Sequence, residues 1–349
     1  MRARSRRSTA GQARAAGGCR RSCDSTRDLS SAPAVSAIII FLDAEKFLAE
    51  AIESVLAQDF SDWELALVDD GSSDASTQIA LRYAARHPGR IRYLAHAGRG
   101  NRGMSASRNL GIAQSRAPLI AFLDADDVWM PEKLSAQVAL MREQPEAAVV
   151  FGQTKFWFSW SGAAPSPRRD FVWRLDAPTD ALFPPPSLLY HAPLGNCLKP
   201  SMSNFMMRRS QLDRIGRFEE SFRNLHEDYV FWIKVFANAT VYHAEACWDW
   251  CRHHRDSFSN VRLPPRQARE EAKGYERWVI DYFASRRVAD PYLRALLAQF
   301  ELRARHPRVF RFLPQYHLQR LRRVLHRLSR TGLRQDIRGR LVRLRRGAW

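Results

Sequence analysis

The sequence is poor in cysteine, and this limits what can hold the fold together. Its 349 residues include five cysteines, an odd number that argues against a framework of disulfide bonds. Cys247 and Cys251 are followed closely by two histidines, but the spacing matches no common zinc site. We therefore expect neither disulfides nor structural zinc, and the ordinary apolar content of 45% is enough for a large core.

Long apolar runs are also absent. No stretch approaches the ~18 consecutive apolar residues that a membrane-spanning helix needs. The N-terminus is charged but lacks the apolar segment of a secretory signal. From these absences we expect a cytoplasmic protein without membrane helices.

Acidic residues are scarce at both ends of the chain, and this scarcity accounts for the net charge of +19. Residues 1–31 contain eight arginines against two aspartates, and residues 303–349 contain fifteen arginines against Asp336 alone. The region between them is close to neutral. Basic tails commonly bind polyanions or anionic lipid, so we expect residues 303–349 to bind an anionic membrane face peripherally. A neutral body argues against a dedicated nucleic-acid groove, and an arginine-rich N-terminal tail without any partner stays an open alternative.

Strand-like and helix-like patterns alternate between residues 35 and 151. Continuous apolar runs predict buried strands, and apolar residues at helical spacing predict helices between them. This alternation is typical of a mainly parallel, doubly wound α/β sheet flanked by helices. The expected strands cover 35–41, 63–68, 91–94, 119–123 and 147–151, and the expected helices cover 44–58, 77–87, 106–114 and 131–143.

The rest of the chain divides by composition. Residues 1–32 are rich in Arg, Ser, Ala and Gly, which predicts disorder. Residues 157–203 are rich in Pro, Ser and Trp with weak periodicity, and we interpret them as a partly ordered region on the acceptor side. Past residue 265 the pattern is helical, over 268–284 and 292–305. Leucines then recur among arginines from 318 to 344, which indicates a basic amphipathic segment.

Two of the expected strands end in carboxylates. A buried strand that runs directly into several negative charges needs a cation to meet them. Because the carboxyl ends of parallel strands meet at one edge of the sheet, where open α/β sheets bind ligands, the two tips predict a single site. The carboxylates are Asp124, Asp126 and Asp127 after the fourth strand, and Asp69 and Asp70 after the second.

Each acidic tip also has a purely structural explanation. Asp126 or Asp127 is a candidate N-cap for the helix expected to open at Pro131. The sequence Asp70-Gly71-Ser72 is typical of a turn closed by an aspartate side chain. Capping accounts for one aspartate and leaves the other two unexplained, and a turn at Asp70 is compatible with ligand binding.

Seven blocks in a fixed order extend this pattern: Val35–Ile40, Ala51–Gln58, Glu64–Asp74, Asn101–Gly111, Asp124–Asp126, His226–Asp228 and Arg252–Ser257. In this order they resemble the inverting glycosyltransferases of family 2, which bind nucleotide sugars through the GT-A fold. The resemblance covers about residues 35–260. It depends on the order of the blocks, because an Asp-x-Asp motif alone carries little information.

The resemblance implies a domain organisation. A GT-A domain is expected over 33–262, with a nucleotide-sugar half at 33–152 and an acceptor half at 153–262. The disordered basic tail 1–32 precedes this domain, and a basic helical C-terminal extension, 263–349, follows it.

Roles near the second strand are also implied by the resemblance. Asp70 is expected to accept a hydrogen bond from the nucleotide base, and Asp69 to contact the base or support the loop. Arg108 is expected to reach the base or the phosphates, with a helix-surface arginine as an equal alternative. Two departures concern the base: Asp43 stands where the family commonly has Asn, and Leu42 where an aromatic side chain often packs.

The Asp-x-Asp motif is expected to bind a divalent ion. By the resemblance, Asp124 lies near the ribose and the metal, and Asp126 binds the metal. Carboxylate oxygens suit Mg²⁺ or Mn²⁺, which would neutralise a departing diphosphate. His254 is expected to complete the metal shell or touch the diphosphate, and a structural role for this histidine stays open.

Asp228 is the expected general base. An inverting transfer is a single displacement in which the acceptor hydroxyl loses its proton, and a carboxylate at hydrogen-bond range is sufficient for that. Glu227 is expected to raise the pKa of Asp228 or bind the acceptor. The alternative is a helix N-terminus, because Tyr229–Lys234 has helical character and acidic residues favour such ends.

These inferences combine into one functional hypothesis. We expect a metal-dependent inverting glycosyltransferase that moves a sugar from a nucleotide donor, with UDP favoured, to a lipid-linked or cell-surface glycan acceptor in cell-wall or polysaccharide biosynthesis. The Gln-x-x-Arg-Trp element of processive synthases is absent, which favours transfer of single sugars. A non-catalytic nucleotide-sugar or glycan-binding protein is the alternative.

Overall fold

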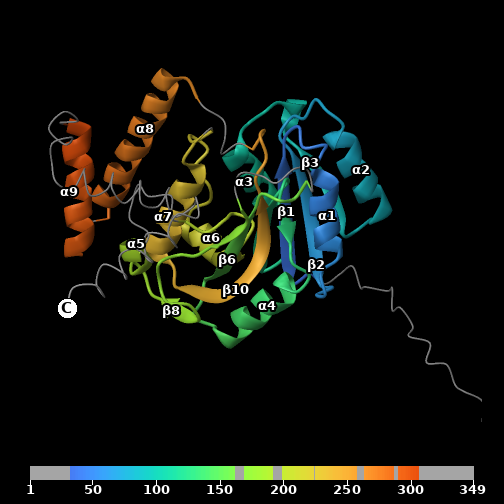
Figure 1. The fold of residues 1–349 in the computed structure, drawn as a ribbon, viewed down its shortest axis with the longest axis horizontal. Coiled ribbons are helices and arrows are strands. Elements are labelled where there is room, and N and C mark those ends of the chain that lie inside the picture. The colour runs from blue at the N-terminus through green and yellow to red at the C-terminus, as the bar shows by residue number, and fades with distance from the viewer. Residues whose placement is uncertain are drawn as a thin grey trace, which may run out of the picture. The chain divides into compact units, whose positions relative to one another are not determined.

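The structure is a computed structural model that describes residues 32–161, 169–191, 199–223, 225–257, 263–286 and 290–305. The amphipathic segment expected at 318–344, and all but the last residue of the tail expected at 1–32, lie outside these residues. Within them, a ten-stranded sheet has the strand order β3-β2-β1-β4-β9-β6-β10-β5, with β7 paired to β6 and β8 to β10 (Figure 1).

Four parallel strands form the first half of the sheet. The register pairs Val35 with Trp63 and with Leu119, so that β1, β2 and β4 end at the same edge. The expected strands and the helices between them are confirmed with small shifts at their ends. The elements are β1 (Val35–Phe41), α1 (Leu48–Leu56), β2 (Trp63–Asp69), α2 (Ser76–Arg86), β3 (Ile91–Ala95), α3 (Met104–Gln114) and β4 (Leu119–Asp124).

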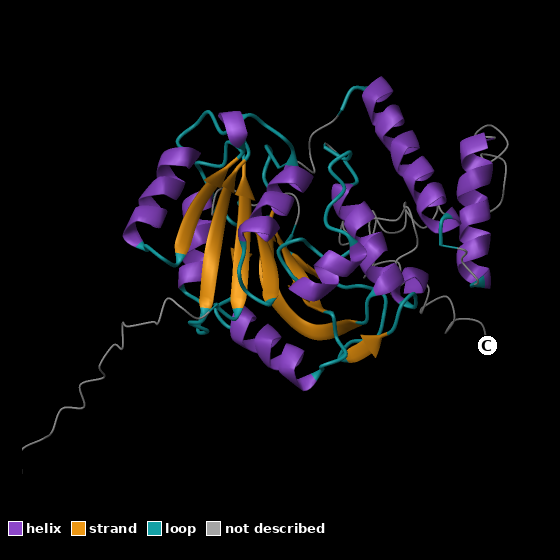
Figure 2. Ribbon diagram, turned by 180° about the vertical axis from the view of Figure 1, so that it is seen from behind, coloured by secondary structure: helices purple, strands orange, loops and turns teal. Residues whose placement is uncertain are grey.

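Side chains alternate across the sheet and build a core on each face, as the period of a strand requires. Along β1, Ala37 and Ile39 pack with α1, α2 and α4 (Lys133–Glu143), whereas Ile38 packs with α3, α6 (Arg209–Ile215) and α7 (Glu227–Asn238). Figure 2 shows helices on both sides of the sheet. Because helices cover both faces of the sheet, β1 and β2 are continuous apolar runs in the sequence.

The second half of the sheet departs from simple alternation. The strand predicted to follow β4, which is β6 (Val149–Trp157), does not pair with it. Instead β9 (Met206–Arg208) lies between them, antiparallel to both. β10 (Val241–Arg252) runs parallel to β6, and the short β5 (Val128–Trp129) pairs antiparallel with β10. The sheet is therefore mixed and mostly parallel, with an antiparallel insertion that the sequence pattern did not predict.

Short elements of regular structure occur in the region 157–203. Its described parts include β7 (Phe171–Trp173), β8 (Ala181–Phe183) and α5 (Leu188–His191). The helix expected at Pro131 begins instead at Lys133 with Glu132 as its N-cap, so neither Asp126 nor Asp127 caps it. The capping alternative for the acidic tip is therefore wrong.

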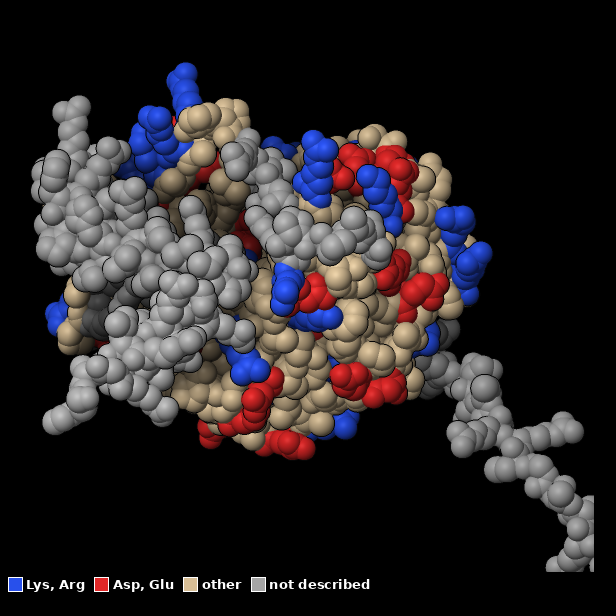
Figure 3. Space-filling model, viewed as in Figure 1, with Lys and Arg blue, Asp and Glu red and all other residues tan. Residues whose placement is uncertain are grey.

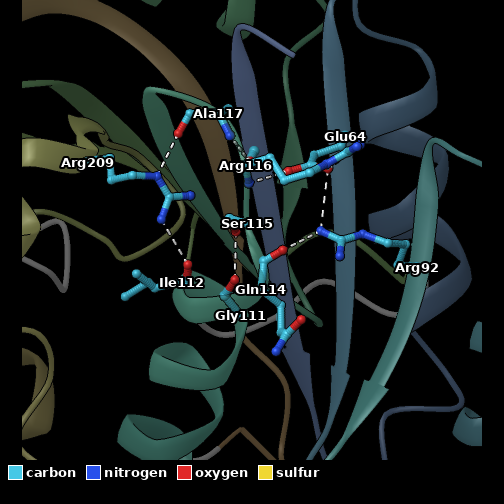
Figure 4. Close-up of polar contacts among 10 residues, drawn as sticks. Glu64, Arg92, Gly111, Ile112, Gln114, Ser115, Arg116, Ala117 and Arg209 are labelled. Atoms are coloured by element: carbon cyan, nitrogen blue, oxygen red, sulfur yellow. Dashed lines mark hydrogen bonds and ion pairs between the residues drawn. The ribbon is translucent and has the colours of Figure 1, made fainter. Parts of the chain in front are cut away.

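A buried carboxylate fixes the start of β4 at the edge opposite the acidic tips. Glu64 is 1% exposed and accepts hydrogen bonds from Ser36 Oγ, the Arg116 N–H and the Arg116 side chain. Burial acts to raise the pKa of Glu64, but these bonds and the charge of Arg92 outweigh it and lower the pKa. Figure 4 shows Arg209 beside this cluster, donating to the carbonyl of Ile112 near the end of α3 and to that of Ala117 before β4. Charges here serve the fold, because they hold β4 in register with β1 and β2.

Two further helices follow the sheet, as the sequence predicted for the start of the C-terminal extension. α8 (Pro265–Ala284) and α9 (Pro291–Arg305) pack against each other, and Tyr275, Val279 and Phe283 of α8 join the core that contains α7. Figures 1 and 2 both show this pair beyond α7, away from β1. Among the described residues, none of the helices combines the length and the apolar character needed to span a bilayer. The domain limits at 152 and 262 stay a prediction.

Candidate active site

The acidic tip of β4 is held by a buried hydroxyl. The Asp124 N–H donates to Ser203 Oγ at 3.0 Å, and the Ser203 hydroxyl donates to Asp127 Oδ2 at 2.6 Å. Asp127 is 2% exposed, and burial together with the charges of Asp126 and Asp124 raises its pKa well above the ordinary value. Asp127 is therefore a supporting residue, whereas the side chains of Asp124 and Asp126 are about one-third exposed to solvent.

Strand pairing explains how His254 reaches this tip. β5 follows Asp127, and its antiparallel register pairs Val128 with Trp250 of β10. Residues that precede β5 therefore lie opposite residues that follow Trp250, and His254 Nε2 lies 3.1 Å from Asp126 Oδ2. Arg252 donates to the Asp126 carbonyl at 2.8 Å and pairs with Glu50 of α1, so it links the backbone of the acidic tip to this helix.

The tip of β2 is a tightly bonded turn. Asp69 Oδ1 accepts the N–H groups of Gly71 and Ser72 at 3.1 and 2.8 Å. Its Oδ2 accepts the hydroxyls of Thr77 and Tyr93. Burial acts to raise the pKa of Asp69, but the hydrogen bonds from Thr77, Ser72 and Tyr93 outweigh it and lower the pKa. Asp69 thus supports the loop, one of the two roles expected for it.

Asp70 connects this turn to the start of α3. Its carboxylate accepts the N–H groups of Arg102 and Gly103, at 2.8 and 3.0 Å, and His96 Nε2 lies 3.6 Å away. Gly71 adopts a φ of +93°, and a Cβ there would lie 2.9 Å from both the Arg99 carbonyl and the Asn101 nitrogen. The turn therefore requires glycine and fixes the loop in front of α3.

The position that departs from the family at the end of β1 has a conformational explanation. Asp43 has a φ of +49°, in the left-handed region that Asn and Asp tolerate better than other residues. Its Oδ1 accepts the Ser73 N–H at 2.7 Å. Asp43 therefore supplies the loop contact that Asn is equally suited to make. Leu42 is 43% exposed beside it.

Arg108 joins the two acidic regions from the interior. Its side chain, on α3, is 2% exposed. The guanidinium donates to Asp124 Oδ1 at 3.0 Å and lies 3.5 Å from Glu227 Oε1, with the Phe218 ring centre 5.4 Å away. The arginine predicted to bind the donor is thus a buried bridge from the tip of β4 to the start of α7 in this structure.

The predicted base lies at the first turn of α7. Glu227 and Asp228 are its first two residues, and His226 precedes them in a left-handed conformation. The unpaired N–H groups of a first helical turn favour carboxylates, so the helix-start explanation and the catalytic role are compatible. Asp228 Oδ1 accepts the Tyr229 N–H at 2.7 Å, and its Oδ2 contacts Lys199 Nζ.

Burial and like charge act on Glu227. It is 6% exposed, and burial followed by the charge of Asp228 raises its pKa to about 7. The cations of Arg108 and Lys199 oppose this rise. From α8, Tyr275 stacks on His226 with ring centres 4.6 Å apart, which fixes the residue before the acidic pair.

The donor set fits a hard divalent cation, although it is not a closed cluster. No group of three or more His, Cys, Asp or Glu side chains at metal-binding spacing occurs in the described ranges. Asp124 and Asp126 nevertheless offer carboxylate oxygens at the opening, beside the imidazole of His254. Burial and the charge of Asp126 raise the pKa of Asp124. A bound cation would offset the repulsion between these two carboxylates.

Sequence reasoning missed the side chains that come from residues 199–204. Lys199 and Ser203 contact the aspartates described above. Asn204 accepts the Gly152 N–H and donates to the Gln153 carbonyl. The available signal was a polar segment, Ser201 to Asn204, placed directly before the apolar run that forms β9. Nothing local indicates that this segment reaches β4, because the pairing of β9 with β4 is long-range.

The family model for glycosyl transferase family 2 matches residues 36–216, more than half of the chain. The chain belongs to glycosyl transferase family 2. Sequence relatives agree with this placement. EpsE of Bacillus subtilis is 37% identical over 122 residues, which are 35% of this chain and 43% of EpsE. RP339 of Rickettsia prowazekii, an uncharacterized glycosyltransferase, is 28% identical over 234 residues, 66% of this chain and 67% of RP339.

Solved structures show the fold. The crystal structure of S. aureus TarS in complex with UDP-GlcNAc matches with a TM-score of 0.54 at 20% identity, covering 77% of this chain and 72% of that chain. The complex of TarS with UDP matches with a TM-score of 0.52 at 18% identity, covering 77% and 71%. The expected GT-A fold is thereby confirmed. The chain spans 43% and 35% of the length of the first two curated relatives that it matches.

Proposed function

We propose that this protein is a metal-dependent inverting glycosyltransferase that moves a single sugar from a nucleotide-sugar donor to a glycan or lipid-linked acceptor. One observation carries the proposal. Arg108 connects Asp124, at the tip of β4, to Glu227, which stands directly before Asp228 on α7. Arg108 thereby connects the residues proposed to bind the nucleotide sugar with the residue proposed as the general base.

The donor side comprises the tips of β2 and β4. Asp70 holds the loop before α3 and presents its remaining acceptor capacity to a nucleotide base. Asp124 and Asp126, with His254, would hold Mn²⁺ or Mg²⁺, which supplies Lewis-acid neutralisation of the diphosphate when bound. UDP is the proposed nucleotide, and the TarS complexes with UDP and UDP-GlcNAc support it by their shared fold.

The base side is the start of α7. Asp228 takes the proton of the acceptor hydroxyl as that oxygen attacks the anomeric carbon. The attack is a single displacement of the nucleotide diphosphate, which inverts the configuration. Glu227 is buried against Arg108 and positions Asp228. This division gives the neighbouring carboxylates different roles, one at the opening and one in the interior.

A ligand screen with the full chain tests the proposal. Thermal unfolding is followed with UDP-, GDP- and dTDP-sugars, with and without Mn²⁺, because a ligand that binds the folded state raises its stability. We expect a UDP-sugar to stabilise the protein in a Mn²⁺-dependent manner, with the dependence lost in Asp126→Ala. The product formed with a glycan acceptor should carry the opposite anomeric configuration. Donor binding without turnover on any acceptor would instead identify a non-catalytic binding protein.

The cellular setting also belongs to the proposal. We place the protein in the cytoplasm, on an anionic membrane face through residues 303–349, with a role in cell-wall or polysaccharide biosynthesis. On the face shown in Figure 3, lysines and arginines of the described residues are interspersed with aspartates and glutamates. This mixture favours membrane binding through residues 303–349 over binding through that face. A variant ending at Arg305 should no longer bind anionic vesicles at low salt, and unchanged binding would refute the assignment.

A further inference from the structure

Lys199 is a cation at the candidate site that none of the sequence motifs contains. It precedes the segment 201–204 that supports the tip of β4, and its Nζ contacts Asp228 Oδ2. The side chains of Lys199 and Asp228 are 20% and 21% exposed. The ammonium also lies 5.1 Å from the centre of the Tyr229 ring. The ion pair is therefore partly accessible to solvent.

Two cations serve the acidic pair from different directions. Arg108, with a 2% exposed side chain, contacts Glu227 from the interior, whereas Lys199 contacts Asp228. Burial acts to lower the pKa of Lys199, but the charges of Asp228, Glu227 and Asp124 outweigh it and raise the pKa. Lys199 therefore stays charged. A lysine ammonium on its flexible stem changes partner more readily than a guanidinium held by two carboxylates.

The contact occupies the oxygen that the proposed chemistry needs. Asp228 Oδ1 already accepts the Tyr229 N–H, and Oδ2 faces Lys199. A general base must be within hydrogen-bond range of the proton that it takes, so the ammonium competes with the acceptor hydroxyl for Oδ2. A diphosphate bound beside Asp124 offers the ammonium a more highly charged partner.

We propose that Lys199 is a donor-responsive latch on the general base, an inference that rests on the proposed glycosyltransferase function. In the donor-free protein, its ammonium holds Asp228 Oδ2. When the donor diphosphate binds, the ammonium moves to a phosphate oxygen and leaves Oδ2 open to the acceptor hydroxyl.

The transfer itself balances with these groups. The acceptor oxygen forms a bond to the anomeric carbon while the bond from that carbon to the phosphate oxygen breaks. The hydroxyl proton goes to Asp228 Oδ2, and the electron pair stays on the departing phosphate oxygen. Lys199 offsets the new negative charge there. The base thus becomes available only when the donor is in place.

Calorimetric titration of UDP into the full chain in the presence of Mn²⁺ tests the latch. Lys199→Met should weaken UDP binding by about tenfold, because a charge-assisted contact to the diphosphate is lost. Lys199→Arg should retain most of the affinity. Lys155→Met is the matched control: its ammonium pairs with Asp170 at 3.3 Å with 27% side-chain exposure and lies 4.0 Å from the Trp250 ring centre, so UDP affinity should change by less than about twofold.

A double-mutant cycle separates the latch from a general electrostatic effect. Asp228→Asn releases the ammonium and should tighten UDP binding by about threefold or more in the wild-type background, with little change in the Lys199→Met background. Equal tightening in both backgrounds would show that only the lost carboxylate charge matters, and would overturn the latch. If Lys199→Met does not fold, Lys199→Gln takes its place in the cycle.

The outcomes distinguish the latch from the function on which it rests. If the wild-type protein binds UDP and transfers sugar while Lys199→Met binds UDP equally well, the latch is wrong and the glycosyltransferase stands. If the wild-type protein binds neither UDP nor GDP nor dTDP, the proposed function and the latch are both overturned.

Discussion

His254 Nε2 lies 3.1 Å from Asp126 Oδ2, although 128 residues separate them in the chain. The contact follows from one short antiparallel pairing, because β5 begins two residues after Asp126 and pairs with the end of β10. Phe47 packs against the imidazole, with ring centres 4.5 Å apart and the rings tilted by 42°. The histidine is thus oriented by packing, with one nitrogen directed at the Asp-x-Asp tip.

Replacing this histidine should weaken metal binding. His254→Ala removes a ligand from the proposed ion, so the affinity for Mn²⁺ should fall by about tenfold or more. Free Mn²⁺ measured by electron paramagnetic resonance reports binding without any need for turnover. His253→Ala is the control, because its ring stacks on Phe156 and Phe158, 4.9 and 4.6 Å away. Unchanged Mn²⁺ binding in His254→Ala would assign the histidine a structural role.

Arg108 should be among the residues most sensitive to substitution. Arg108→Met leaves the buried Glu227 and the half-buried Asp124 without their shared cation, and breaking such a buried pair costs about 3–5 kcal/mol. Urea unfolding measures the loss. The exposed pair of Lys46 with Asp256, with side chains 69% and 70% exposed, gives the comparison: Lys46→Met should cost less than about 1 kcal/mol.

A second substitution checks the cause of that loss. Adding Glu227→Gln to Arg108→Met replaces the buried carboxyl group that has lost its cation by a neutral amide, so part of the stability should return. Additive losses in the double variant would contradict the bridge.

The raised pKa of Glu227 predicts a pH-dependent stability. Its folded-state pKa of about 7 lies above the ordinary value of 4.5, so the folded protein binds more protons than the unfolded chain between these values. The contribution of Glu227 therefore falls as pH rises from 4.5 to 7, by up to about 3 kcal/mol. The unfolding free energy of wild type minus that of Glu227→Gln should therefore decrease, and can become negative, as pH rises over this range. A difference that stays constant or grows with pH would show that Glu227 is ionised in the folded protein.

The turn after β2 should not tolerate a side chain at Gly71. Gly71→Ala places a Cβ 2.9 Å from two backbone atoms of the facing loop at a φ of +93°, so the loop must shift and donor binding should be lost. Gly100→Ala is the matched control in the facing loop, because a Cβ there meets nothing within 4 Å and its φ is −92°. Titration with UDP compares the two variants. Equal affinity for UDP in both would separate this turn from the donor site.

The acidic tips and their shared edge followed from the sequence because both signals are local. An apolar run that ends in carboxylates shows at once where a strand stops, and parallel strands then place Asp70 and Asp124 at the same edge of the sheet. The position of His254 depends on β5, which has only two residues, and that of Ser203 on β9, which has three. Elements this short carry no periodicity, and their partners are distant in sequence.

Local patterns also gave incomplete accounts of single residues. The spacing of Asp127 before Pro131 suggested a cap, but the pairing of Val128 and Trp129 with β10 separates Asp127 from α4. The sequence was equally compatible with Arg108 as a residue that binds the nucleotide sugar and as a residue on the helix surface. Its burial between two carboxylates depends on the long-range approach of α7 to α3. Nothing in the sequence indicated that Lys199 lies at the site, because none of the seven blocks includes it.

The rate of a single turnover by Asp228→Asn tests the central claim most directly, with the donor that the ligand screen selects held at saturation. Removing a general base should slow the sugar transfer step by about 100-fold or more, while UDP binds the variant at least as tightly as it binds wild type. Transfer within about tenfold of the wild-type rate would contradict the account, because the acceptor proton would then leave by another route.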